Sequence, residues 1–195
     1  MLDSLIATLR ARAPRRVLLV GEAPARGSVA ALDRSSRSGQ RLRCLMEGGA
    51  PFDAVNLLFR GDDRWDPRVA RMRARRLIDQ GWMADREVVL LGRRVARAFA
   101  RLQPALDALA AAPPFSLATP TVPRLCGGWA ASMVWWAPHP SGRNRWWNAP
   151  ANRAAGKVFF GLVLGRLEFP PRPELPAAAK GLLELALDAL GGATS

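Results

Sequence analysis

The chain has 195 residues, 29 of them lysine or arginine and 16 aspartate or glutamate, which gives a formal net charge of +13. This length predicts a single domain over residues 1–195, with a core large enough to fold without disulfides or structural metal. Nearly all of the positive charge is arginine, whose planar guanidinium pairs with phosphate and stacks on flat rings. A polyanion is therefore the expected partner, although an arginine-rich composition is also typical of a GC-rich genome.

The cysteines and the apolar runs favour a soluble protein of the cytoplasm. Cys44 and Cys126 have neither a short-range pairing nor a metal-ligand spacing, which argues against an iron–sulfur or structural zinc site. No apolar run reaches the roughly 18 residues that a membrane span needs. Residues 1–12 predict an amphipathic helix with an acidic residue rather than a signal peptide, so no membrane partner is expected.

Four short apolar runs predict buried strands, at residues 15–20, 53–59, 87–91 and 132–137. Helices are predicted at residues 38–47, 66–80, 93–102 and 151–164, with Asp66 as N-cap and Pro67 at the first helical position of the second. Residues 104–123 predict a short helix mixed with loop, and residues 175–190 a last amphipathic helix packed on the domain. The alternation of strand and helix predicts an α/β fold with a mostly parallel, four-stranded sheet.

In such folds ligands bind at the carboxyl ends of the strands, so the loops that follow the four strands are the candidate site. The first loop begins Gly21-Glu22-Ala23-Pro24-Ala25, where the glycine allows a close backbone approach and Glu22 puts a carboxylate at the mouth of the sheet. No lysine followed by serine or threonine closes this loop, so it is not a Walker phosphate loop. A plain turn with a solvated glutamate is the alternative interpretation.

Asn56 lies inside the second apolar run, where an unpaired carboxamide would be costly, so it needs a partner. A carboxamide can accept from one N–H and donate to one C=O, which matches the N3 and O4 edge of uracil. The alternative is a bond to the backbone of a neighbouring loop. Gly92 and Arg93 follow the third strand.

His139, the only histidine of the chain, lies between Pro138 and Pro140 directly after the fourth strand. A proline-stiffened loop would hold the imidazole in a fixed place, where it could stabilise negative charge on a leaving base as imidazolium or as a neutral donor. The alternative is a structural histidine. Ser141 follows two residues later, but no G-x-S-x-G motif surrounds it, so a serine hydrolase is disfavoured.

The loop at residues 142–148 contains two arginines, two asparagines and two tryptophans, which suits phosphate contact and base stacking. We expect at least one of Trp146 and Trp147 to be a core residue instead. The five arginines of the helix that follows Asp66 spread too far around the helix to predict one stripe, and a solvated face is favoured.

Taken in order, the segments VLLVGEAPA, SGQRLRCLM, VNLLF, VVLLGRRVARAF and PHPSGRNR resemble the uracil-DNA glycosylase superfamily. The closest pattern is the branch whose first motif reads G-E-A-P-G and whose second begins H-P-S. The resemblance implies a three-layer α/β/α sandwich, monomeric, that binds damaged or single-stranded DNA and flips out uracil or another deaminated base. It implies hydrolysis of the N-glycosidic bond to leave an abasic site, as in base excision repair, with no metal and no cofactor.

The same resemblance assigns roles to residues of this chain. Glu22 falls in the loop that activates water or stabilises the cationic sugar, and His139 matches the histidine that steadies O2 of the departing base. Base-binding positions are Gly21, Ala23, Asn56 and Arg34, of which Asn56 matches the base-reading asparagine. DNA-binding positions are Pro24, Ala25, Ser141, Gly142, Arg143, Asn144 and Arg145.

Ala23 stands where other branches place an acidic or amide residue, as it does in the G-E-A-P branch too, so Glu22 carries the role alone. The chain departs from that branch in three respects. Ser28 and Val29 replace a second acidic pair, and the iron–sulfur cysteines are absent. Arg34 stands where a phenylalanine would stack on the base, so stacking falls to a guanidinium or to another aromatic. The expectation is a monofunctional glycosylase. The alternatives are a DNA-binding module with little or no turnover, and a protein acting on free nucleobases or nucleotides.

Overall fold

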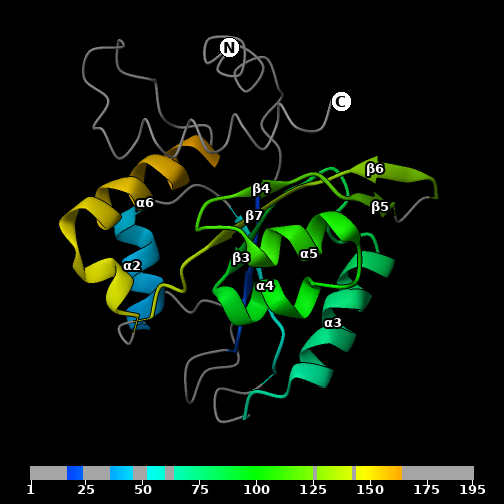
Figure 1. Cartoon of the computed structure of the whole chain (residues 1–195), viewed down its shortest axis with the longest axis horizontal. Helices are drawn as coiled ribbons and strands as arrows, with labels where there is room; N and C mark the ends of the chain where they lie inside the picture. Colours follow the sequence, from blue (N-terminus) through cyan, green and yellow to red (C-terminus); the bar gives the residue numbers. More distant parts are fainter. Residues whose placement is uncertain are drawn as a thin grey trace.

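The computed structural model of the chain describes residues 17–23, 36–45, 52–59, 64–124, 127–141 and 144–163. These residues form an α/β fold in which helices pack against both faces of a mostly parallel sheet (Figure 1). The helices predicted over residues 1–12 and 175–190 lie outside the described residues.

The main sheet of the described residues has five strands in the order β2-β1-β3-β7-β4. Four of them run parallel and match the four predicted runs: β1 (Val17–Gly21), β2 (Phe52–Asn56), β3 (Glu87–Leu91) and β7 (Met133–Ala137). The fifth, β4 (Leu117–Ala118), pairs antiparallel with β7, so the prediction of a four-stranded sheet is wrong by one edge strand. Two residues are too few to show a period, which is why the sequence predicts only helix and loop there.

The helices bury their apolar sides on the two faces of the sheet because successive strand residues point to opposite faces. Leu18 and Val20 of β1 join one buried cluster, and Val17 and Leu19 join the other. The helices of the first cluster are α3 (Pro67–Asp79), α4 (Arg93–Phe99) and α5 (Pro104–Ala111). Those of the second are α2 (Arg37–Leu45) and α6 (Pro150–Val163), and Figure 1 shows the two groups on opposite sides of the strands.

Local signals fix several of these bounds. Asp66 caps α3 as predicted, because its Oδ1 accepts hydrogen bonds from the backbone N–H of Arg68 at 2.7 Å and of Val69 at 3.3 Å.

A separate antiparallel pair, β5 (Thr121–Pro123) and β6 (Trp129–Ala131), also falls where no strand is predicted. Within the described part of the chain, no helix is long and apolar enough to cross a membrane.

The parallel register brings the strand ends to one edge of the sheet. Gly21 pairs with Asn56, and Leu91 pairs with Ala137. The loops after β1, β2, β3 and β7 therefore start from the same edge, as the sequence predicts.

Candidate functional site

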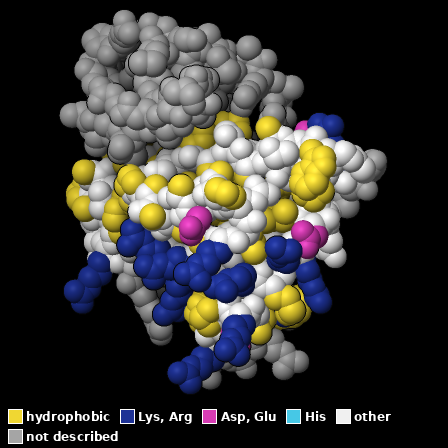
Figure 2. Space-filling model, turned by 45° about the vertical axis from the view of Figure 1, so that its right-hand side comes forward, with side chains coloured by type: hydrophobic (Ala, Val, Ile, Leu, Met, Phe, Trp, Pro, Cys, Tyr) yellow, Lys and Arg dark blue, Asp and Glu magenta, His cyan; other side chains and the backbone are white. Residues whose placement is uncertain are grey.

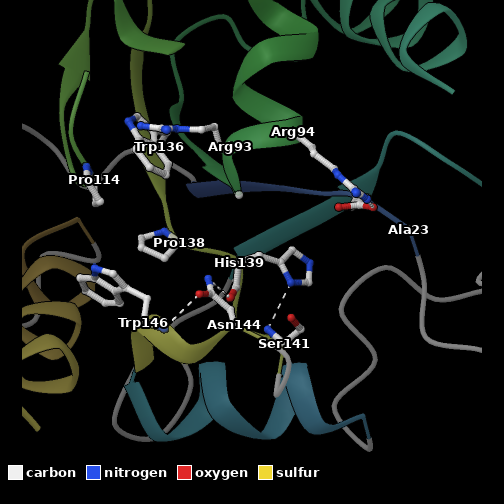
Figure 3. A pocket seen from close by; sticks show the side chains of 12 residues that line it. Ala23, Arg93, Arg94, Pro114, Trp136, Pro138, His139, Ser141, Asn144 and Trp146 are labelled. Atoms are coloured by element: carbon white, nitrogen blue, oxygen red, sulfur yellow. Dashed lines mark hydrogen bonds and ion pairs between the residues drawn. The ribbon is translucent and has the colours of Figure 1, made fainter. Parts of the chain in front are cut away.

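A cavity of about 670 Å³ lies at this edge of the sheet (Figure 3). It is lined by residues at or just after the ends of β1, β3 and β7, together with Pro114 and residues of the loop after β7. In Figure 3 Trp136, Pro114 and Trp146 lie on one side and Arg94 and Ala23 on the other. The full lining is Glu22, Ala23, Gly92, Arg93, Arg94, Pro114, Trp136, Pro138, His139, Ser141, Asn144 and Trp146.

The backbone of His139 is held by two side chains that come later in the chain. Its carbonyl oxygen accepts a hydrogen bond from Nδ2 of Asn144 at 3.0 Å and from Nε1 of Trp147 at 2.8 Å. Trp147 is only 1% exposed, so its indole N–H is a fixed donor. Both prolines beside His139 are buried. The backbone at His139 is therefore held by side chains as well as flanked by buried prolines.

The imidazole of His139 has one nitrogen already occupied. Its Nδ1 accepts a hydrogen bond from the backbone N–H of Ser141 at 3.1 Å, which Figure 3 marks with a dashed line. Burial lowers the pKa of His139 below its ordinary value of 6.5, and the negative charge of Glu22 offsets part of that effect. The ring is neutral at pH 7, and because Nδ1 is the acceptor, the proton is on Nε2. His139 can thus donate one hydrogen bond through Nε2.

Gly92 makes room for His139. Its φ of +103° is a conformation that side chains rarely adopt, and a Cβ built on it would lie 3.0 Å from Cβ of His139. Its N–H donates to the carbonyl of Ala137 at 2.7 Å, which ties the end of β3 to the end of β7. The sequence marks Gly92 only as a residue after the third strand, and its contact with His139 is a tertiary feature.

Glu22 is held in place on the opposite wall. One carboxylate oxygen accepts from Nη1 of Arg94 at 3.0 Å, and its backbone carbonyl accepts from the N–H of Leu58 at 2.9 Å. The Glu22 side chain is 30% exposed, and the Arg94 side chain that pairs with it is 64% exposed. Arg94 is absent from the sequence-based candidates, and its position one residue into the helix after β3 is the signal that could have indicated it.

Asn56 lies at the end of β2, in register with Gly21. Its Oδ1 is buried and has no hydrogen-bond partner among the described residues. A buried acceptor without a partner costs about 1–3 kcal/mol unless a bound group satisfies it. Neither Asn56 nor Gly21 is among the described residues that line the cavity, so the structure does not bring them together with His139 there.

Some residues of the loop after His139 face the cavity, and others face solvent. Asn144 lines the cavity, but its Nδ2 is used on His139 and its Oδ1 accepts from the N–H of Trp146 at 3.1 Å. The carbonyl of Ser141 accepts from Nη1 of Arg41 at 3.0 Å. Arg145 is exposed. Asn144 is therefore a residue that shapes the loop, whereas Arg145 remains free to meet a ligand from solvent.

Trp147 is a core residue, which confirms the expectation that at least one of the two tryptophans is structural. Trp146 is half-buried, lines the cavity, and packs with its ring centroid 5.4 Å from that of Phe115. With Trp136 it makes one wall of the cavity aromatic.

The remaining predicted positions are Pro24, Ala25, Arg34, Gly142 and Arg143, and they lie outside the described residues. No group of three or more histidine, cysteine, aspartate or glutamate side chains gathers in the part of the chain that the structure describes. Comparison of the chain with protein-family models, with curated proteins and with solved structures found no match.

Proposed function

We propose that this protein is a monofunctional DNA glycosylase that excises uracil or another deaminated base and leaves an abasic site. The observation that carries the proposal is the placing of His139, whose Nδ1 accepts from the N–H of Ser141 and which lines one cavity together with Glu22. A three-layer α/β/α sandwich of the uracil-DNA glycosylase superfamily is part of the same proposal, which helices on both faces of a mostly parallel sheet support.

The chemistry requires charge stabilisation at two ends of one bond. Cleavage of an N-glycosidic bond develops positive charge on the sugar and negative charge on the departing base. Donation from Nε2 of His139 would stabilise the base oxygen, and the carboxylate of Glu22 would stabilise the sugar or orient water. The two residues line the same cavity, and the charge of Glu22 acts on the imidazole, as its effect on the pKa of His139 indicates.

A DNA-binding module with little turnover is the second candidate. The ion pair between Glu22 and Arg94 favours it, because a carboxylate engaged by a guanidinium is less available to water or to a sugar cation. Ala23 adds no second acidic group beside it.

Labelled oligonucleotides that carry uracil, hypoxanthine or xanthine, single-stranded or paired, test the proposal directly. After incubation with the protein, alkali cleaves the strand at any abasic site. A glycosylase yields cleavage at one of these bases, and Glu22→Ala abolishes or strongly reduces it. Salt-sensitive binding of the same oligonucleotides without cleavage would establish the binding module instead.

The titration of His139 gives an independent prediction. We expect the imidazole to titrate below 6.5, and Glu22→Gln to move the titration further down, because it removes the negative charge that raises the pKa. Excision should decline as the pH falls below 6.5, at a lower pH than an imidazole of ordinary pKa would give. In the same interval the unfolded chain takes up a proton before the folded one does, so the free energy of unfolding falls as the pH falls.

Because the chain has one histidine, proton NMR of the imidazole measures this pKa without an assignment problem. Asp85→Asn is the matched control: it also removes one negative charge, and Asp85 pairs with Arg124 before β3 begins, at the other end of that strand. A wild-type pKa at or above 6.5, or equal shifts in the two variants, would contradict the environment described for His139.

A further inference from the structure

An exposed aromatic ring lies beside the loop that holds Glu22. Phe59 follows β2 and is 71% exposed. The guanidinium of Arg73 on α3 lies over its ring, 3.4 Å from the centroid. With one face of the ring covered by Arg73, the exposure of Phe59 leaves the other face open to solvent.

Backbone contacts fix this ring relative to the cavity. Arg73 also donates from Nη1 to the carbonyl of Leu57 at 2.8 Å, so the guanidinium is anchored at two points. The N–H of Leu58 donates to the carbonyl of Glu22 at 2.9 Å. Phe59 therefore directly follows Leu58, the residue that contacts the loop of Glu22. Its ring packs against Arg73 of α3.

The two adjoining helices α3 and α4 carry further exposed arginines. The sequence predicts that those of α3 form no single stripe, and the structure agrees for the five together. Arg73 turns toward Leu57 and Phe59, and Arg76 lies off the line of the other three. Arg68, Arg71 and Arg75 are exposed and spaced three and four residues apart, which places them on one face of the helix. The arginine face comprises these three residues and Arg93, Arg94 and Arg97 of α4, all of them exposed.

Figure 2 shows dark blue side chains gathered in a band on the side of the molecule where these helices lie, with acidic side chains at its upper edge. Of the six arginines, Arg94 is the one with an ion pair to a described residue. Since Arg94 also lines the cavity, the arginine face continues into the candidate site.

We propose that Phe59 and the arginine face bind a single-stranded nucleic acid, with an unpaired base stacked on the open face of Phe59 and the phosphates along the arginines. Stacking on aromatic rings and a cationic track for the backbone are the two features by which proteins hold single strands. An acidic protein would use the charge but would have no need of a rigid, flat ring. The inference rests on the proposed function, which puts the excised nucleotide in the cavity. It adds a surface that binds the neighbouring nucleotides of the same strand.

Binding of an undamaged single-stranded oligodeoxynucleotide, followed by fluorescence anisotropy over a range of salt concentrations, tests this surface. The triple variant Arg68→Ala, Arg71→Ala, Arg75→Ala should flatten the slope of log affinity against log salt by about 2, since each phosphate contact contributes about 0.7 on single strands. Phe59→Ala should weaken affinity for the single strand about tenfold and leave affinity for a fully paired duplex unchanged.

Two variants serve as matched controls. Lys157→Ala removes an exposed cation from α6, on the other face of the sheet, and Trp129→Ala removes an aromatic residue of β6 that is 68% exposed. Each should leave the affinity and the salt slope close to those of the wild type, and a thermal melt establishes that every variant folds. An unchanged slope in the triple variant, or a loss in Phe59→Ala no greater than in Trp129→Ala, overturns the inference.

The undamaged strand has no base to excise, so this measurement does not depend on catalysis. Binding with the expected losses but no excision of any damaged base would refute the glycosylase and leave the surface intact. Suppose instead that the wild type excises a damaged base, and that neither the triple variant nor Phe59→Ala changes single-strand affinity. That result would refute the surface and leave the glycosylase intact.

Discussion

His139→Ala is expected to lower the rate of base excision by about a hundredfold or more while changing affinity for DNA only slightly. The variant removes the Nε2–H donor that the cavity presents, and that donor acts on charge which develops only in the transition state. It leaves the carbonyl of residue 139 in place, so the hydrogen bonds from Asn144 and Trp147 can persist. Single-turnover excision and oligonucleotide affinity, measured on the same preparation, give the two values.

His139→Gln is the informative companion, because a carboxamide can still donate a hydrogen bond. It should retain more excision than His139→Ala and should lose the acid limb of the pH profile, since it has no imidazole to protonate. Equal losses of excision and affinity in His139→Ala would mean that the residue supports the loop and takes no part in the reaction.

Gly156→Ala is expected to destabilise the protein by about 1–3 kcal/mol, although glycine to alanine in a helix ordinarily stabilises by about 1 kcal/mol. Gly156 lies within α6, and a Cβ there would overlap Cζ3 of the Trp147 ring. The ring cannot yield easily, because it is fully buried and donates to the carbonyl of His139. Denaturant unfolding measures the change, and excision should fall together with stability.

A second substitution separates the steric effect from the hydrogen bond. Trp147→Phe in the Gly156→Ala background removes the overlapping part of the ring, so stability should partly recover. Excision should stay low, because phenylalanine has no N–H for His139. A Gly156→Ala protein more stable than the wild type would show that Trp147 moves aside freely and does not fix the loop.

The sequence predicts much of the fold because its signals are local. Continuous apolar runs mark β1, β3 and β7, and the Asp66-Pro67 pair marks the start of α3. The predicted strand at residues 53–59 ends early at Asn56, because the backbone bends there while Leu57 and Leu58 turn their N–H groups to the loop after β1. The edge strand β4 has no such signal, since its pairing depends on β7.

The candidate site likewise has features that the sequence predicts and features that depend on tertiary packing. Glu22 and His139 can be predicted to share a cavity because each follows a strand of one parallel sheet. The ion pair of Glu22 with Arg94 and the fit of His139 against Gly92 join residues far apart in the chain. Such contacts depend on how the helices pack, which neither the spacing nor the residue types express.

The two proposed catalytic groups are supported by different cores. The loop of His139 is tied through Trp147 to the cluster that contains α6, whereas Glu22 is tied through Arg94 to α4, which packs on the opposite face. The sheet between the two clusters thus sets the distance between the imidazole of His139 and the carboxylate of Glu22. Repacking either core would alter this separation from a distance, and rates could be tuned through interior residues that never meet the substrate.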